Sequence, residues 1–282
     1  MSVSELFEPI KKSHAIAETI FFFEFANRLI ANQKKMESLK SNLADLFSEF
    51  DETKSVQITL ENSETPSIQQ NSDAIQMVRR NATSNALEWI VRIAGPSISI
   101  HCLEYYRWAP AKQFFLDVLK RVLEALDTQE PLLGGGLRVL DRFRFMPSAG
   151  KYNISELLDP ESVYVSDHVF SSGERWHVYT GWFEPGKLES TEVLSQLNLD
   201  SSYTTSSDGE LQSFVTLDHT LSLRDSENKV SKSPLGALSD GKKVLDSASE
   251  LFEAFHLCNK SVIFNVLNKK IAEQMNLRQG GA

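Results

Sequence analysis

The chain has 282 residues, of which 41% are hydrophobic and 24% are charged, and its formal net charge is −9 at pH 7. This composition is typical of a soluble globular protein, and the acidic balance argues against binding to a phosphate backbone, so we expect no nucleic-acid partner. Cys102 and Cys258 stand too far apart for a metal or redox motif. We interpret them as apolar thiols of a reducing compartment.

The first apolar run, residues 16–25, does not have the pattern of a targeting segment. It contains Glu18 and Glu24 and is too short to span a bilayer. We therefore expect a cytoplasmic protein without a membrane partner.

The N-terminal part of the chain predicts strands and two helices. Residues 15–25 are rich in β-branched and aromatic side chains, which is typical of a strand. Their alternation gives a core face made of Ala17, Thr19, Phe21, Phe23 and Phe25. Helical spacing predicts helices at 33–50 and 108–126, with strands at 55–60, 74–80, 86–94 and 97–103. The polar residues 61–73 indicate a surface loop.

The second part of the chain repeats this order. Gly134–Gly136 is interpreted as a linker between two halves. A strand is expected at 137–146 and a short helix at 154–158, followed by strands at 163–170, 175–183, 203–205 and 211–223. Residues 244–275 keep a helical apolar period, which predicts one terminal helix of about 50 Å at 1.5 Å per residue.

The prediction is an α+β fold of two similar halves. Each half has the order strand, helix, four strands, helix, and is expected to form an antiparallel sheet packed on a long helix. Residues 1–133 would form the first half and residues 134–282 the second. An internal duplication of this kind frames a groove when the two halves pack as one compact unit.

Three arginines are the most suggestive cluster. Strand periodicity places Arg138, Arg142 and Arg144 on one face of 137–146, with Asp141 on the other. Two interpretations stay open: ion pairs with Glu18 and Glu24 that fix the register between the halves, or a site for a carboxylate or phosphate. The ligand-binding candidates are Arg138, Arg142, Arg144, Glu18, His177 and His101.

Catalytic and metal-binding signatures do not occur in the sequence. No pair of histidines has H-x-x-x-H or H-E-x-x-H spacing, and there is no G-x-S-x-G motif, P-loop or dinucleotide fingerprint. His168 and His219 each follow an aspartate, and adjacent residues of a strand face opposite ways. We expect no metal, no cofactor and no catalytic residue. Among the aromatic residues, Trp89, Trp176 and Trp182 are expected to face inward, and Tyr105, Tyr106 and Trp108 to be exposed.

Three segments together resemble a sporadically distributed prokaryotic family of uncharacterised proteins. They are Ala17-Glu18-Thr19-Ile20-Phe21, the strand with Gly136-Leu137-Arg138 and Asp141-Arg142, and the C-terminal helix with His256 and Phe264. The family has an aromatic residue and an asparagine where this chain has Val139 and Asp141. The resemblance implies a bacterial or archaeal cytosolic protein with patchy occurrence, and it implies no activity, cofactor or site. By analogy, such occurrence suits toxin–antitoxin, immunity or phage-defence systems.

The leading functional hypothesis is a non-catalytic binding or interaction protein, such as an accessory or neutralising partner in a conflict system. Its partner would be a protein or a small ligand, and a homo-oligomer is compatible with the sequence. The alternatives are an enzyme whose site assembles at the seam between the halves, and a carrier of a hydrophobic ligand.

Overall fold

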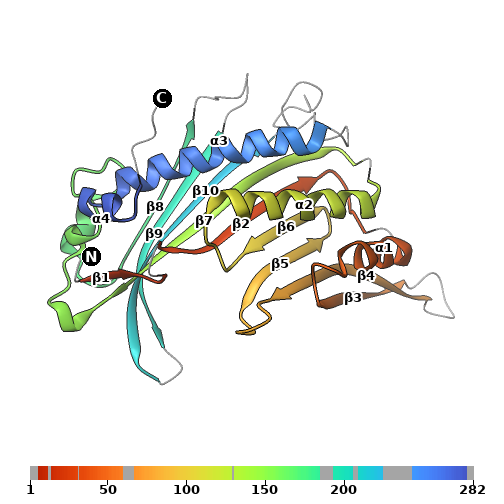
Figure 1. Cartoon of the computed structure of the whole chain (residues 1–282), viewed down its shortest axis with the longest axis horizontal. Coiled ribbons are helices and arrows are strands. Elements are labelled where there is room, and N and C mark those ends of the chain that lie inside the picture. Colours follow the sequence, from red (N-terminus) through yellow and green to blue (C-terminus); the bar gives the residue numbers. More distant parts are fainter. Residues whose placement is uncertain are drawn as a thin grey trace. The chain divides into compact units, whose positions relative to one another are not determined.

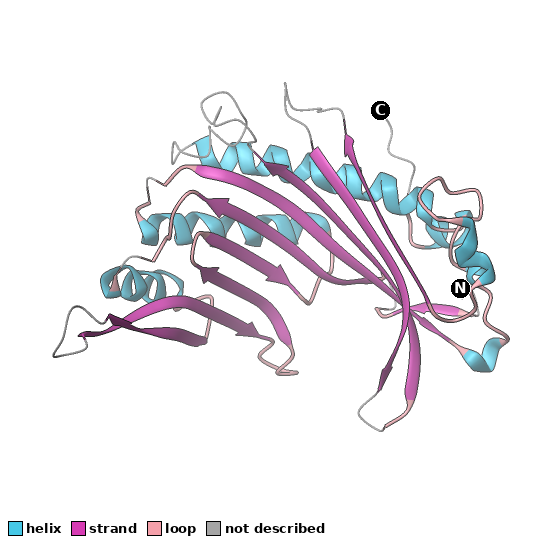
Figure 2. Ribbon diagram, turned by 180° about the vertical axis from the view of Figure 1, so that it is seen from behind, coloured by secondary structure: helices cyan, strands magenta, loops and turns pink. Residues whose placement is uncertain are grey.

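The computed structural model describes residues 6–11, 14–30, 32–59, 67–128, 130–184, 193–205, 209–224 and 243–277. The fold is α+β, as predicted, with an antiparallel sheet of ten strands. Figure 1 labels the elements along the chain and Figure 2 distinguishes the helices from the strands. None of the described helices is long and apolar enough to cross a membrane.

The bounds of the elements follow the chain. The strands are β1 Phe7–Pro9, β2 Ile16–Phe25, β3 Glu49–Thr59, β4 Ser67–Arg80, β5 Leu87–Ala94, β6 Ser97–Cys102, β7 Leu132–Phe145, β8 Trp176–Glu184, β9 Val193–Thr205 and β10 Leu211–Arg224. The α-helices are α1 Gln33–Leu43, α2 Trp108–Leu126, α3 Lys243–Val266 and α4 Lys269–Gln274. Short 3-10 helices are η1 Pro147–Ala149, η2 Ile154–Glu156 and η3 Asp167–Ser171.

The strand order in the sheet is β3-β4-β5-β6-β2-β7-β10-β9-β8, with β1 paired to β7. Two compact units share these elements. Unit 1 contains residues 1–19, 136–223 and 251–282, and unit 2 contains residues 20–135 and 224–250. Strands β2 and β7 and helix α3 each contribute residues to both units.

In unit 2, β2 and α2 pack through aromatic rings. Phe21, Phe23 and Phe25 of β2 are buried, as the alternation predicts. The rings of Phe21 and Phe115 stack with their centroids 4.1 Å apart. Trp89 of β5 packs against Phe114 of α2 with a centroid distance of 4.5 Å. Aromatic pairs of this kind contribute about 0.5–1.5 kcal/mol beyond the area that they bury.

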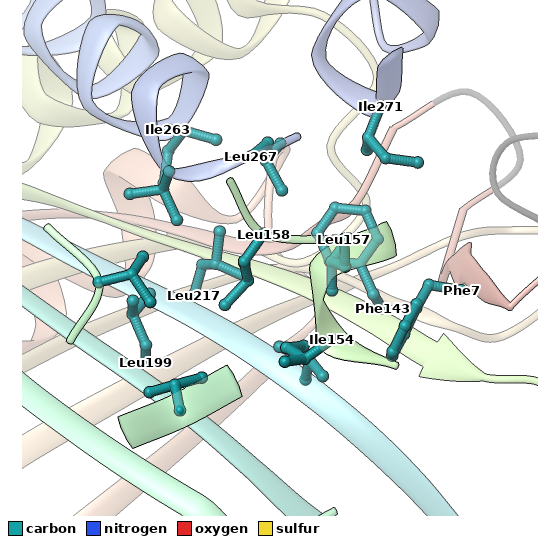
Figure 3. Packing of buried hydrophobic residues seen from close by; sticks show 14 of the residues in the cluster. Phe7, Phe143, Ile154, Leu157, Leu158, Leu199, Leu217, Ile263, Leu267 and Ile271 are labelled. Atoms are coloured by element: carbon teal, nitrogen blue, oxygen red, sulfur yellow. The ribbon is translucent and has the colours of Figure 1, made fainter. Parts of the chain in front are cut away.

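In unit 1, an apolar cluster lies between the sheet and the C-terminal helices (Figure 3). Phe143 of β7 and Leu217 of β10 supply the sheet side, and Ile263 and Ile271 supply the helices. The loop with Leu157 adds further aliphatic side chains, which explains how a stretch with little regular structure is anchored.

Several local predictions are wrong. The helix predicted at 33–50 ends at Leu43, and Glu49 and Phe50 belong to β3. Residues 163–170 are not a strand, because turns and η3 occupy them, so three strands rather than four follow β7. Gly134–Gly136 is buried inside β7 and is not a linker. A Cβ on Gly135 would lie 3.2 Å from the Phe22 carbonyl oxygen, so glycine permits the close approach of β2. Residues 67–73 belong to β4 rather than to a surface loop, and residues 60–66 lie outside the described residues.

The predicted single terminal helix is also wrong, since it is interrupted between α3 and α4. The Asn268 side chain accepts from Lys270 N at 3.0 Å, which caps α4, and its Nδ2 donates to the Ser155 carbonyl at 3.0 Å. The Asn268 amide also donates to the Leu157 carbonyl at 2.8 Å. These bonds attach the chain between α3 and α4 to the η2 loop. The apolar period continues on both sides of this interruption.

Replacing Asn268→Ala is expected to lower the free energy of unfolding by about 1–3 kcal/mol, because it removes a helix cap and leaves the Ser155 carbonyl without its donor. Urea denaturation measures the change. Asn265→Ala is the matched control, since Asn265 is exposed and its Nδ2 donates to the Ser261 carbonyl of its own helix, so its loss should cost less than about 0.5 kcal/mol. Equal costs for the two variants would contradict this role of Asn268.

Candidate interaction face of unit 1

The predicted arginine face exists in unit 1. Arg138, Arg142 and Arg144 are partly exposed on β7, whereas Asp141 is buried on the opposite face, as strand periodicity predicts. Arg138 forms a bidentate ion pair with Asp218 of β10, with Nε–Oδ1 and Nη2–Oδ2 distances of 2.7 and 2.5 Å. This pair, with a smaller contribution from Glu18, raises the pKa of Arg138. The ion-pair partner of Arg138 is therefore Asp218 of the same unit, rather than the predicted Glu18 or Glu24.

Arg142 and Arg144 are held in different ways. The Arg142 guanidinium lies over the Phe214 ring, 3.9 Å from its centroid, and Nη2 donates to Thr204 Oγ1 at 2.8 Å. Burial lowers the pKa of Arg142, although the Asp200 carboxylate opposes this. Its Nε has no hydrogen-bond partner among the described residues. Arg144 Nη2 pairs with Glu8 Oε2 at 3.0 Å at an exposed position.

The two candidate histidines belong to different units. His177 is exposed on β8 of unit 1, where the register places it opposite Asp200 of β9. His101 is on β6 of unit 2 and its Nε2 lies 2.9 Å from Ser99 Oγ. Five of the six predicted residues therefore lie in unit 1, and only His101 lies in unit 2.

Strand β8 carries most of the exposed aromatic surface of this face. Its odd-numbered residues His177, Tyr179, Gly181 and Phe183 are solvent-facing, and the side chains of Tyr179 and Phe183 are 60% and 63% exposed. The Tyr179 hydroxyl bonds Gln196 of β9, and Gly181 lies opposite the same residue. The even-numbered residues Trp176 and Val178 are buried on the other face.

Strand β8 is also one end of the sheet, so only one of its edges pairs with a neighbour. All nine of its residues pair with β9. No other backbone hydrogen bond to β8 occurs among the described residues. From Trp176 to Phe183 the strand carries no lysine, arginine, aspartate, glutamate or proline, which are the residues that normally protect an edge.

The opposite end of the sheet, β3, differs from β8 in this respect. Three of the first four residues of β3 are acidic, namely Glu49, Asp51 and Glu52. Their charges make the addition of another strand costly, because they would have to be desolvated in the new pair. The sheet thus has one edge with charged residues and one edge with aromatic residues.

Behind this face lies a buried polar network that the sequence did not predict. The His219 Nδ1–H donates to Asn259 Oδ1 and the Ser195 hydroxyl donates to His219 Nε2, both at 2.8 Å. These residues come from β10, α3 and β9. Burial lowers the pKa of His219 to about 4, so the ring is neutral and the network holds at pH 7.

An aromatic stack extends this network toward β8. The Trp182 ring stacks on His219 with a centroid distance of 6.2 Å, and Tyr164 stacks on Trp182 at 4.9 Å. Trp182 Nε1 donates to Glu184 Oε1 at 2.5 Å. Trp89 and Trp176 are buried as predicted, and Trp182 is half-buried. Tyr106 is exposed as predicted, whereas Tyr105 is buried and Trp108 is half-buried and stacked on Phe21.

The order of hydrogen bonds from serine to histidine to asparagine is that of a nucleophile relay, but the network is closed to substrate. The side chains of Ser195 and His219 are both 0% exposed. A nucleophile needs access to its substrate and a base whose pKa lies near the working pH. We therefore interpret the network as structural: its hydrogen bonds hold α3 against the sheet.

The signal for this network was present in the sequence. In β10, His219 has the same phase as Val215, Leu217 and Leu221. Asn259 continues the stripe of Phe252 and Phe255 on α3. A polar residue in an apolar phase indicates a buried hydrogen-bonded group.

No group of three or more histidine, cysteine, aspartate or glutamate residues that could hold a metal ion occurs in the part of the chain that the structure describes. Comparison of the sequence with family models and with curated proteins found no match.

Proposed function

We propose that the protein is a non-catalytic interaction protein, and that it binds an extended segment of a partner protein by strand addition at the open edge of β8. The observation that carries this proposal is the aromatic edge strand β8, which has no lysine, arginine, aspartate or glutamate before its last residue, Glu184. Backbone groups on such an edge form a ladder with the added strand, and the side chains beside it provide specificity.

The exposed rings support the same conclusion. Tyr179 and Phe183 alternate with His177 and Gly181 along β8, and all four residues face solvent on the same side of the sheet. A strand added next to β8 would place its own side chains within about 5 Å of these rings. Aromatic residues are enriched in the energetic centres of protein interfaces.

The buried network behind β8 and β9 supports this function by holding the edge in place. Trp182 of β8 stacks on His219, and His219 connects β9 to α3 through hydrogen bonds to Ser195 and Asn259. A pre-ordered edge loses less conformational entropy when a partner binds. The enzyme and carrier alternatives have no comparable specific observation in the described residues.

The resemblance to a sporadically distributed prokaryotic family indicates the partners to test first. We infer a cytoplasmic role in a conflict system, in which this chain is an accessory or neutralising partner. We also infer that the two sets of strands and helices arose by internal duplication.

The paired substitution Tyr179→Lys with Phe183→Lys is expected to abolish partner binding, because lysine protects an edge strand against additional pairing. Native mass spectrometry of the tagged chain, purified gently from its own host, measures the bound partner. Tyr106→Lys is the matched control, since Tyr106 is a tyrosine of unit 2 that is 71% exposed. Equal recovery of the partner by all three chains would contradict binding at β8.

A further inference from the structure

The open edge of β8 is complementary to a second copy of itself. The strand runs from Trp176 to Glu184, and its midpoint is Thr180. Antiparallel pairing about Thr180 therefore matches all nine residues with nine residues of the second copy. Any other register that keeps the pleat in phase leaves at least one end of the strand without a partner.

Side-chain sizes match in this register. Tyr179 would lie opposite Gly181 of the second copy, and His177 would lie opposite Phe183. Directly opposite side chains in an antiparallel pair are about 4.5–5.5 Å apart, so a large ring needs a small or flat neighbour. Gly181 provides the small one. On the other side of the sheet, Thr180 would face Thr180, and Val178 would face Trp182.

The strand ends favour the antiparallel direction. Arg175 immediately precedes β8, and Glu184 is its last residue. Alternation puts these two side chains on opposite faces, and the antiparallel register places Glu184 opposite Trp176, so no two like charges lie directly opposite each other. A parallel, in-register arrangement would instead place Arg175 beside Arg175 and Glu184 beside Glu184, which is unfavourable.

We propose that, in the absence of its partner, the chain forms a twofold dimer in which β8 pairs with β8 of a second copy about Thr180. This inference rests on the proposed function, because the same edge serves both. Self-pairing would regulate the site: the dimer protects the edge from non-specific association, and the partner competes with it by mass action. The contact involves one strand of nine residues, so we expect a weak dimer that exchanges readily.

Sedimentation velocity of the purified chain over a range of concentrations tests the dimer. We expect the wild type and Tyr106→Lys to dimerise alike, and the paired Tyr179→Lys and Phe183→Lys substitution to weaken dimerisation at least about tenfold. Thr180→Cys tests the register, because opposite residues of an antiparallel pair lie within the Cα–Cα range of a disulfide. Mild oxidation should join the two substituted positions, as identified by peptide mapping.

A wild type that stays monomeric at every concentration would overturn the proposal, and so would a dimer that the β8 substitutions leave unchanged. The absence of a disulfide at position 180 would overturn the register. The proposed function is judged separately: a monomer that still loses its partner through the β8 substitutions keeps strand addition and excludes only self-pairing.

Discussion

Asp141→Asn is expected to stabilise the protein at pH 8 by up to about 4 kcal/mol and to leave its stability nearly unchanged at pH 4. Asp141 is almost completely buried on β7, and burial raises its pKa from 3.8 to about 7. Because the pKa is higher in the folded state, the unfolded chain binds fewer protons between these values. The contribution of the protonated carboxyl is therefore complete below pH 3.8 and is lost as the pH rises to about 7.

The asparagine stays neutral at every pH, so it avoids the cost of a buried carboxylate. Chemical denaturation at pH 4 and pH 8 measures the two differences. Asp167→Asn is the control, since Asp167 is exposed in η3 and its change should be within about 0.5 kcal/mol at both values. A destabilised Asp141→Asn at pH 8, or the same difference at both pH values, would show that the carboxylate is favourably solvated or paired.

His219→Phe is expected to destabilise the protein by about 2–4 kcal/mol at pH 7, because it removes both hydrogen bonds of the ring and leaves two buried polar groups unpaired. Those groups are the Ser195 hydroxyl and the Asn259 amide oxygen. The triple variant with Ser195→Ala and Asn259→Leu added is the matched control. It removes the polar partners as well, so it should recover a large part of the loss.

The pH dependence of this variant provides a second test. The pKa of His219 falls from 6.5 to about 4 on folding. The neutral ring therefore stabilises the fold fully above pH 6.5, and this contribution, about 3 kcal/mol, is lost as the pH falls to about 4.

The contributions of His219 and Asp141 change in opposite directions over nearly the same pH interval. The free energy of unfolding of the wild type should therefore change little between pH 4 and 7 on their account. Asp141→Asn should make stability rise with pH there, and His219→Phe should make it fall. Parallel curves for the two variants would contradict these assignments.

Local patterns in the sequence predict the elements whose own side chains define them. The alternation of β2 and the apolar stripe of α2 both agree with the structure. The prediction that Arg138 and Asp141 lie on opposite faces of β7 is also confirmed. In these cases burial follows directly from the strand or helix period.

The errors occur where contacts distant in sequence decide the structure. The apolar period of residues 244–275 runs through Asn268, whereas α3 ends at Val266, where the chain bonds to the loop around η2 through Val266 and Asn268. Residues 163–170 have strand-forming side chains, yet η3 forms because Val169 packs into the core of unit 1.

The candidate site was only partly predictable for the same reason. The arginine face could be read from β7 alone. The open edge could not, because the position of β8 at the end of the sheet depends on the order of all the strands. No local pattern distinguishes an edge strand with aromatic residues from a central one.

The most direct test of binding at β8 is hydrogen–deuterium exchange of the backbone amides, comparing the chain alone at low concentration with the same chain bound to the partner recovered from its host. We predict that amides of β8 that are not bonded to β9 become protected on binding, while β3, the edge with charged residues, does not change. Protection at β3, or a stable complex in which β8 exchanges as fast as in the free chain, would contradict strand addition at this edge.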